Sequence, residues 1–262
     1  MGRRRLNDRR ILLTGASGGI GRELALQLAP YGTKLYLVAR SAGPLAELAQ
    51  QLKQLGAASA EPVVGDVTDP NLRGRLVEQI RNEYGALDLL INNAGISAHG
   101  RFEQSSPEVM RQIMEVNFFA AVELARECLP LLKSGDDPLL VNVGSILGHR
   151  GLPFNNEYCA SKAALVGWSE AIRPELKRSG VNLLMISPGT TDTEFFDHLI
   201  ATGEQLPWGK QQGIAAQKVA SLIIRAIRSR RYEIFPNWRG RLLVLLNRLS
   251  PALVDRFMNR YG

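Results

Sequence analysis

Short apolar runs alternate with longer amphipathic segments through most of this chain, and this alternation limits its possible folds more than any other feature. Strands are predicted at residues 11–14, 34–39, 62–64, 87–92, 139–143 and 181–186. Helices are predicted between them at residues 20–29, 45–55, 72–84, 107–132 and 157–179. The strands are nearly all apolar, as expected where helices cover both faces of a parallel sheet. The pattern therefore predicts an α/β fold with a doubly wound, mostly parallel sheet.

The regular alternation stops at Pro188. Residues 190–213 form a long irregular stretch, which a helix at residues 215–229 and a short strand at residues 232–235 follow. The sequence contains no internal repeat, low-complexity segment or linker that would divide it. We therefore expect residues 1–262 to form a single domain, a size that one α/β domain commonly reaches.

The first predicted strand runs into a glycine-rich turn, residues 14–21, which reads TGASGGIG. Glycine at positions such as Gly15, Gly19 and Gly21 lets the backbone turn sharply and approach a pyrophosphate. The N-terminus of the helix that follows would supply free N–H groups and the positive end of the helix dipole. Because the turn lies between a strand and a helix, it predicts a dinucleotide-binding site.

At this turn the chain resembles the short-chain dehydrogenase/reductase family, whose first turn reads TGxxxGIG rather than GxGxxG. The resemblance extends over most of the chain, and phrases such as TGASGGIGREL and VAR make it somewhat closer to the hydroxysteroid and retinol dehydrogenase-like branch. The further matching positions are Asp66-Val67, the NNAG motif at residues 92–95, Asn117, Ser145, the YxxxK motif of Tyr158 and Lys162, and the PGxxxT motif of Pro188, Gly189 and Thr193.

The resemblance implies a Rossmann-type domain with helices on both faces of the sheet, which transfers a hydride between a nicotinamide cofactor and an alcohol or carbonyl substrate. Residues 190–213 would form its substrate loop or lid. The catalytic residues would be Asn117, Ser145, Tyr158 and Lys162. The cofactor would be bound by Gly15, Ser17, Gly19, Ile20, Gly21, Arg40, Asp66, Val67, Asn93, Gly95, Tyr158, Lys162, Pro188, Gly189, Thr191 and Thr193.

The four-residue spacing of the YxxxK motif lets its tyrosine and lysine act together. Residues four apart lie on one face of a helix, so Tyr158 and Lys162 can point into one cleft. A free tyrosine has a pKa of about 10 and is a poor base at neutral pH, whereas a nearby ammonium lowers that pKa. Proton transfer between the phenol and an alcohol oxygen then becomes feasible.

The resemblance assigns each catalytic residue a role. Tyr158 would give a proton to the carbonyl oxygen during reduction, or remove it from the alcohol during oxidation. Lys162 would lower the pKa of Tyr158 and hold the nicotinamide ribose. Ser145 would hydrogen-bond the substrate oxygen, and Asn117 would help to anchor a water in the proton relay. The hydride chemistry belongs to the nicotinamide.

The choice of cofactor depends on the end of the second predicted strand, where residues 38–41 read Val-Ala-Arg-Ser. An acidic residue there would accept a hydrogen bond from the ribose 2′-hydroxyl of NAD, whereas an arginine accommodates the 2′-phosphate of NADP. Arg40 offers a planar set of donors suited to phosphate. Some NADP-preferring relatives place a second basic residue in the glycine turn, where this chain has Gly18. We therefore predict NADP(H) from Arg40, with NAD(H) less favoured and a solvent-facing arginine as the plain alternative.

The predicted activity is the reduction of a ketone or aldehyde, or the reverse oxidation. The rival interpretation is a non-catalytic NADP-binding sensor or scaffold with the same fold, and the complete set of four catalytic residues argues against it. Aromatic side chains expected near the substrate favour a lipophilic small molecule, although they could equally pack in the core or the lid. They are Phe154, Phe196 and Trp208.

The net charge of +7 is compatible with a nucleic-acid binder, an enzyme with anionic ligands, a protein on an anionic membrane, or a general arginine bias. We expect no nucleic-acid partner, because the chain has no stacking platform or nucleic-acid motif. We also expect no metal, since His99, His149 and His198 lack the spacing of ligands. His99 and His149 follow the motifs at the cleft rim, where they would be substrate contacts or ordinary surface histidines.

Cys128 and Cys159 lie inside predicted helices and show no redox or metal spacing. They favour a reduced compartment, so we expect a cytoplasmic protein. Residues 238–262 form an apolar and basic tail, with an apolar run between Arg241 and Arg248. Two expectations stay open for it. The tail packs on the domain or on a sister subunit in a homo-oligomer, a dimer or tetramer, or it lies peripherally on a membrane surface.

Overall fold

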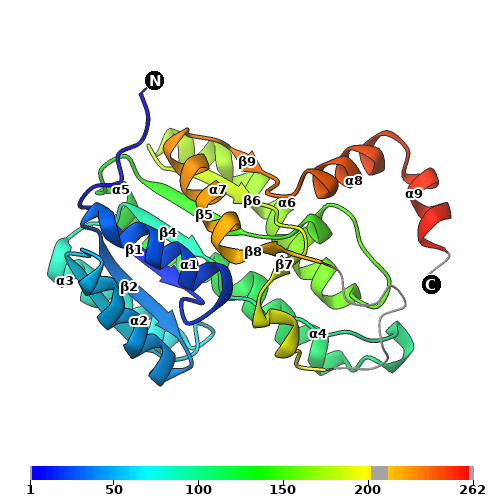
Figure 1. The fold of residues 1–262 in the computed structure, drawn as a ribbon, viewed down its shortest axis with the longest axis horizontal. Coiled ribbons are helices and arrows are strands. Elements are labelled where there is room, and N and C mark those ends of the chain that lie inside the picture. Colours follow the sequence, from blue (N-terminus) through cyan, green and yellow to red (C-terminus); the bar gives the residue numbers. More distant parts are fainter. Residues whose placement is uncertain (1, 202–211, 260–262) are drawn as a thin grey trace.

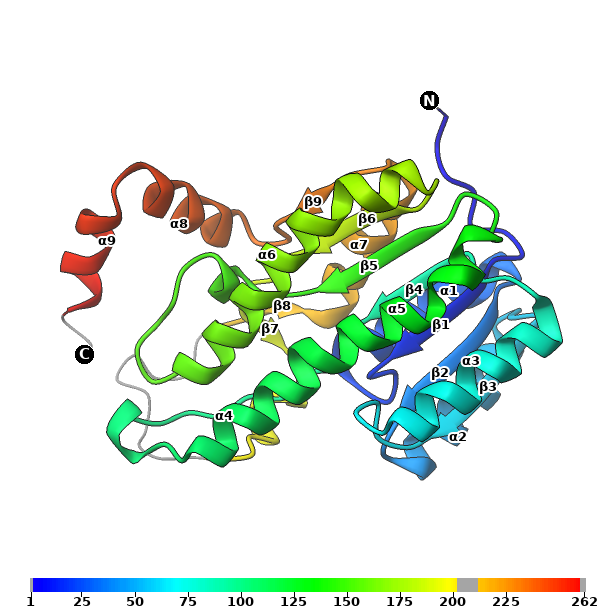
Figure 2. The same ribbon diagram turned by 180° about the vertical axis from the view of Figure 1, so that it is seen from behind.

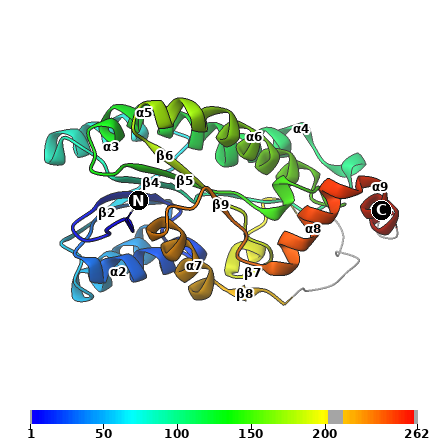
Figure 3. The ribbon, with the colours of Figure 1, turned by 90° about the horizontal axis from the view of Figure 1, so that it is seen from above.

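The computed structural model describes residues 2–201 and 212–259, and its centre is a sheet enclosed between two layers of helices (Figure 3). Among these residues, seven parallel strands form this sheet. Their order is β3 (Ser59–Val64), β2 (Lys34–Ala39), β1 (Arg10–Thr14), β4 (Leu89–Asn92), β5 (Leu139–Val143), β6 (Asn182–Ile186) and β9 (Glu233–Ile234). The order reverses between β1 and β4, which confirms the predicted doubly wound α/β fold.

The two helical layers differ in sequence position but follow from the same strand pattern. One layer contains α1 (Gly19–Leu28), α2 (Ala42–Gln54) and α7 (Ala216–Arg228), and the other contains α3 (Pro70–Tyr84), α5 (Ala120–Lys133) and α6 (Asn156–Arg178) (Figure 3). Side chains alternate across a strand, so Ile11 and Leu13 join the core of the first layer while Leu12 joins that of the second. Both faces of the sheet are therefore buried, which explains why the strands are continuously apolar.

The long helix predicted at residues 107–132 is wrong as one regular helix. The segment consists of α4 (Pro107–Met114), a π-helical turn (Glu115–Phe119) and α5, which run on from one another (Figure 2). The turn carries the buried side chain of Asn117. A π turn accommodates an extra residue in a helix, and such turns are frequent at functional sites.

The irregular stretch at residues 190–213 is closed at its base by a second, two-stranded sheet. Thr191–Asp192 (β7) pairs in parallel with Ile214–Ala215 (β8). Residues 202–211 of the predicted lid, which include Trp208, lie outside the described residues. A short 3₁₀ turn at Glu194–Asp197 lies within the irregular stretch, and others occur at Ala29–Tyr31, Phe102–Gln104 and Ile146–Gly148.

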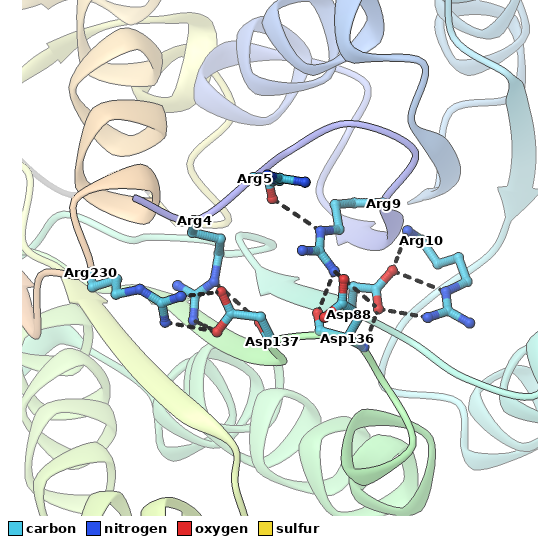
Figure 4. Close-up of polar contacts among 8 residues, drawn as sticks. All are labelled: Arg4, Arg5, Arg9, Arg10, Asp88, Asp136, Asp137 and Arg230. Atoms are coloured by element: carbon cyan, nitrogen blue, oxygen red, sulfur yellow. Dashed lines mark hydrogen bonds and ion pairs between the residues drawn. The ribbon is translucent and has the colours of Figure 1, made fainter. Parts of the chain in front are cut away.

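The basic N-terminal segment is fixed by ion pairs at the amino-terminal ends of the central strands (Figure 4). Arg10 binds Asp88 through two hydrogen bonds of 2.7 and 2.9 Å, and Arg9 lies 2.6 Å from an Asp136 carboxylate oxygen. Burial alone would raise the pKa of Asp88, but hydrogen bonds from Arg10 and from the backbone N–H of Asp136 together outweigh it and hold that pKa below its ordinary value.

A second group of ion pairs joins the N-terminal segment to the residues after α7 (Figure 4). Arg4 and Arg230 converge on the carboxylate of Asp137, with nitrogen–oxygen distances of 3.0 and 2.7 Å. Part of the positive charge at the start of the chain is thus matched by carboxylates that follow α5. The sequence does not reveal this pairing, because the partners are far apart along the chain, 133 residues for Arg4 and Asp137 and 93 residues for Arg230 and Asp137.

The tail consists of two helices, α8 (Trp238–Leu249) and α9 (Pro251–Met258), which extend beyond the sheet and its helical layers (Figures 1 and 2). Intrachain packing covers little of it, because Leu249 is 75% exposed and Leu253 is 59% exposed. None of the helices in the described parts of the chain is long and apolar enough to cross a bilayer.

Candidate active site

A cleft of about 1330 Å³ lies at the carboxyl ends of the parallel strands, where the loops after β1, β4, β5 and β6 meet. This is where ligands bind in open α/β sheets. Two predicted site residues, Gly21 and Asn117, are not part of the lining and lie behind it. The predicted residues that do line the cleft are Gly15, Ser17, Gly19, Ile20, Arg40, Asp66, Val67, Asn93, Gly95, Ser145, Tyr158, Lys162, Pro188, Gly189, Thr191 and Thr193.

The glycine turn is shaped so that side chains would block it. Gly15 and Gly19 have φ angles of 64° and 51°, a left-handed conformation that glycine adopts without strain. A Cβ on Gly21 would overlap the carbonyl oxygen of Gly15 and lie 2.6 Å from the side-chain nitrogen of Asn93. The backbone therefore makes a cradle before the N-terminus of α1, which fits a pyrophosphate.

Thr14 and Asn93 tie this turn to the loop after β4. The Thr14 hydroxyl accepts hydrogen bonds from the backbone N–H groups of Asn93 and Ala94, at 3.0 and 3.1 Å. The Asn93 amide in turn donates to the carbonyls of Thr14 and Gly15, at 3.1 and 3.0 Å. The NNAG motif thus fixes the position of the turn, and Asn93 acts at least partly through the backbone around it.

Asn117 braces the same loop from the π-helical turn. Its side chain accepts from the N–H of Ile96 at 2.8 Å and donates to the carbonyl of Ile96 at 2.9 Å. Its amide also donates to the hydroxyl of Ser161, at 2.9 Å, one residue before Lys162. These hydrogen bonds join the loop after β4 to α6. Asn117 therefore fixes the position of Lys162 relative to that loop.

Tyr158 and Ser145 meet at the floor of the cleft. Ser145 is buried at the end of β5, and its hydroxyl hydrogen-bonds the phenol of Tyr158 on α6. Burial raises the pKa of Tyr158 well above its ordinary value, and the hydrogen bond with Ser145 offsets this only in part. The phenol therefore carries its proton at neutral pH in this structure.

Lys162 lies one helical turn from Tyr158, as the motif predicts. Its ammonium donates to the carbonyl of Val143 at 3.0 Å and lies 5.6 Å from the centre of the Tyr158 ring. Burial lowers the pKa of Lys162 to about 8. In this structure burial of the phenol, and not the ammonium, sets the direction of the Tyr158 pKa shift.

The buried ammonium makes the pH dependence of stability testable. Between the folded pKa of about 8 and the unfolded value of 10.5, the unfolded chain binds more protons at Lys162 than the folded chain does. Stability contributed by this group therefore rises with pH in that window. We expect wild type to gain stability relative to Lys162→Met between about pH 8 and pH 10. Urea unfolding midpoints of both proteins at several pH values measure this, and parallel pH profiles would contradict it.

The end of β2 carries the predicted cofactor-selecting residue. Arg40 is exposed and lines the cleft beside Ala39 and Ser41. Asp66, which also lines the cleft, uses one carboxylate oxygen to accept from both the N–H and the hydroxyl of Thr68, at 2.9 and 2.8 Å. The guanidinium of Arg40 is thus placed at the rim, while the nearby acidic side chain is engaged in its own turn.

The substrate side of the cleft corrects some of the sequence-based expectations. His149 does not line the cleft, nor is it a surface residue: its ring is buried against Phe235, and its Nε2 lies 3.0 Å from the Ser187 hydroxyl. Phe154 does not line the cleft either. Phe195 lines it instead, with its ring centre 5.9 Å from that of Tyr158.

Other residues that line the cleft belong to no sequence motif. Trp208 lies outside the described residues. His99 and His198 line the cleft. Lining residues without a sequence signal include Ile96, Val116, Leu147, Leu152, Asn155, Glu194 and Asp197, which come from loops, 3₁₀ turns and the π-helical turn rather than from a motif. Within residues 2–201 and 212–259, no cluster of histidine, cysteine and acidic side chains is arranged to hold a metal ion.

A doubly wound sheet that gathers a phosphate-binding turn and a paired tyrosine and lysine at one edge defines a nucleotide-dependent oxidoreductase. The chain belongs to the short-chain dehydrogenase/reductase family: the family model described as short chain dehydrogenase matches residues 9–203. It is therefore an oxidoreductase that binds a nicotinamide cofactor, and the glycine cradle fits the pyrophosphate of such a cofactor.

Similar proteins support this assignment. The chain is 33% identical over 98% of its length to ketoacyl reductase HetN of Nostoc, covering 90% of that protein. It is 32% identical over 95% of its length to dehydrogenase/reductase SDR family member 7B of Bos taurus, covering 79% of that protein.

Solved structures match the fold. A short chain dehydrogenase/reductase from Burkholderia phymatum in complex with NAD superposes with a TM-score of 0.86 at 24% identity, over 95% of this chain and 96% of that one. An alcohol dehydrogenase from the archaeon Thermococcus sibiricus complexed with 5-hydroxy-NADP superposes with a TM-score of 0.76 at 23% identity, over 87% of this chain and 95% of that one.

Proposed function

We propose that the protein is an NADP(H)-dependent carbonyl reductase that converts a lipophilic ketone or aldehyde into an alcohol. The observation that carries the proposal is the hydrogen-bonded pair of Ser145 and Tyr158 at the floor of the cleft, with Lys162 one turn further along α6. The phenol carries its proton at neutral pH, which is the state that a proton donor to the carbonyl oxygen needs.

The residues divide the reaction among them. The nicotinamide supplies the hydride when the cofactor is bound. Ser145 donates a hydrogen bond to the carbonyl oxygen, and Tyr158 donates the proton that this oxygen takes up as the alcohol forms. Lys162 holds the nicotinamide ribose, and its positive charge stabilises the phenolate that Tyr158 leaves behind.

Arg40 supports the choice of NADP(H). The side chain is exposed at the end of β2 and lines the cleft, where its planar guanidinium can bind a 2′-phosphate through two donors. No carboxylate ends this strand to accept from a free 2′-hydroxyl, since residues 39–41 are Ala, Arg and Ser.

Arg40→Asp is expected to shift cofactor preference from NADPH towards NADH. The new carboxylate repels the 2′-phosphate and accepts from the 2′-hydroxyl, and loss of a charge-assisted pair costs about 1.5–3 kcal/mol, or roughly 10- to 100-fold in kcat/KM for NADPH. The control is Arg40→Ala, which removes the donors without adding a charge and should lower NADPH use while giving no gain with NADH. A wild type that prefers NADH would refute this assignment.

The lipophilic substrate class is supported by the apolar part of the lining. Phe195 packs near the Tyr158 ring, and Ile96, Leu147 and Leu152 add aliphatic surface to the same cleft. A similar protein carries the name ketoacyl reductase, so ketoacyl thioesters head the set of ketones to be tested.

Initial rates of NADPH oxidation test the proposed function directly. The panel is ketoacyl thioesters of increasing chain length, aromatic aldehydes, steroid-like ketones and short sugar-like carbonyls. We expect turnover that increases with the apolar surface of the carbonyl compound. Tight NADPH binding without turnover of any carbonyl would instead support the sensor or scaffold.

A further inference from the structure

Helix α8 has two opposite apolar faces, and the domain covers one of them. Gly240 and Val244 are buried, and a Cβ on Gly240 would lie 2.8 Å from the side chain of Ile146, so this face sits directly on the loop after β5. The opposite face is exposed to solvent. It carries Trp238, Leu242, Leu245 and Leu249, whose exposed fractions are 70%, 46%, 52% and 75%.

These exposed residues form one continuous stripe. Successive residues of an α-helix are about 100° apart, so side chains at spacings of three, four and seven share a face. On α9, Leu253 and Phe257 are also exposed, at 59% and 51%, while Val254 is buried. We call this set of residues the tail stripe. An exposed apolar surface of this extent marks an interaction site.

Arginines border the tail stripe on both sides. At about 100° per residue, Arg241 and Arg248 fall on one margin of the α8 stripe and Arg239 on the other. Arg239 also stacks over the ring of Trp238, with 5.7 Å between its guanidinium carbon and the ring centre. The acidic residue of the tail, Asp255, is already paired with Arg150 at 2.7 Å.

This distribution of charge decides between the two surfaces that would cover the stripe. If two copies met through their tail stripes, the bordering arginines of both would be brought together, because a two-fold interface is self-complementary. Asp255 would not balance them, since it is engaged by Arg150. An anionic lipid surface matches both properties, because the leucines, the tryptophan and the phenylalanine enter the acyl boundary while the arginines reach the phosphates.

We propose that α8 and α9 dock the enzyme on an anionic lipid bilayer, with the tail stripe inserted at the interface and Arg239, Arg241 and Arg248 bound to lipid phosphates. Trp238 lies at the end of the stripe next to Arg239, and tryptophan favours the interfacial depth of a bilayer. The helices lie on the membrane surface and do not span it, because α8 and α9, with 12 and 8 residues, are shorter than the roughly 20 residues that a spanning helix needs.

The docked tail is connected to the cleft. Arg150 binds both Asp255 and Asn247, at 2.7 and 3.3 Å, and the Asn247 amide donates to the carbonyl of His149 at 3.2 Å. The loop that begins with these residues continues to Leu152, which lines the cleft. Docking therefore brings this rim of the cleft close to the bilayer. In this part the inference rests on the proposed function: a lipophilic carbonyl would enter from the membrane.

Vesicle flotation tests the docking with the full-length protein. We expect it to float with vesicles of 70% phosphatidylcholine and 30% phosphatidylglycerol and to stay behind with phosphatidylcholine alone. Leu245→Gln/Leu249→Gln should abolish flotation, whereas Leu55→Gln, an exposed leucine at the end of α2, should not. Arg241→Gln/Arg248→Gln should weaken binding about 30-fold, since each basic residue near an anionic surface contributes about 1 kcal/mol, or roughly fivefold.

A second readout follows the tail itself. Tryptophan emission should shift to shorter wavelength on addition of the anionic vesicles, and Trp238→Phe should remove most of that shift while leaving flotation in place. Thermal unfolding of every variant shows whether it is folded, as expected for substitutions of exposed side chains.

Three results would overturn the proposal. One is the absence of flotation with anionic vesicles. Another is equal flotation with neutral vesicles. The third is a wild-type dimer that Leu245→Gln/Leu249→Gln converts into a monomer, because the stripe would then be a subunit interface. Flotation does not depend on turnover, so failure of the docking and failure of the proposed reductase activity are separate outcomes.

Discussion

Replacing Tyr158 with phenylalanine is expected to lower kcat by about 10²–10⁴-fold, the usual contribution of a general acid, while cofactor affinity stays nearly unchanged. The substitution removes the phenolic proton and the hydrogen bond with Ser145 but keeps the ring, whose centre lies 5.9 Å from that of Phe195. Single-turnover rates and NADPH fluorescence titration separate the two quantities.

The matched control is Tyr232→Phe, because Tyr232 is 64% exposed and does not line the cleft. It should leave both quantities unchanged. If Tyr158→Phe retains more than half of the wild-type kcat, the proton comes from another group and the proposed mechanism is wrong.

Gly21→Ala is expected to abolish cofactor binding, or to weaken it by at least about 30-fold. The new Cβ would overlap the carbonyl oxygen of Gly15 and crowd the Asn93 side chain, so the turn between β1 and α1 must open. Opening it breaks the hydrogen bonds from Asn93 that hold the cradle closed. Each lost bond that leaves a buried partner costs about 1–3 kcal/mol, and two of them correspond to this loss of affinity.

Gly18→Ala is the control in the same turn, since a Cβ there meets no protein atom within 4 Å. It should bind cofactor nearly as well as wild type. Isothermal titration with NADPH and thermal unfolding of both variants give the comparison. Equal affinities for the two variants would show that the turn does not depend on the close approach of Gly21 to Gly15.

The sheet and its helices follow closely from the sequence because each strand is buried on both faces. An apolar run such as residues 139–143, with amphipathic segments on both sides, is compatible with few structures other than a buried parallel strand between two helices. The π-helical turn around Asn117 has no such local signal. It depends on partners far along the chain, since Asn117 holds both backbone groups of Ile96 and the hydroxyl of Ser161.

The candidate site was predicted best where a motif fixes the backbone. Gly15, Gly19 and Gly21 are recognisable because the conformation and close packing of the turn require glycine. The substrate side was predicted poorly, because its residues come from loops whose paths depend on tertiary contacts. Phe154, for which the sequence leaves the substrate site, the core and the lid open, does not line the cleft, whereas Phe195 does.

The burial of the Tyr158 phenol and the Lys162 ammonium could not be predicted from the sequence either. The motif places Tyr158 and Lys162 on one helical face, but it does not state how much solvent each side chain loses. That quantity sets the direction of both pKa shifts.

The ion pairs of Figure 4 lie at the opposite end of the strands from the cleft. The two ends of the sheet therefore differ in how firmly they are held. Asp88 and Asp137 form ion pairs that join the start of the chain to segments far away in sequence, so these ion pairs stabilise the amino-terminal ends of the strands. Loops at the catalytic end can then be exchanged or lengthened without loosening the sheet that carries them. For protein engineering, this makes the region around residues 190–213 the place to graft new specificity, with the arginine segment kept intact.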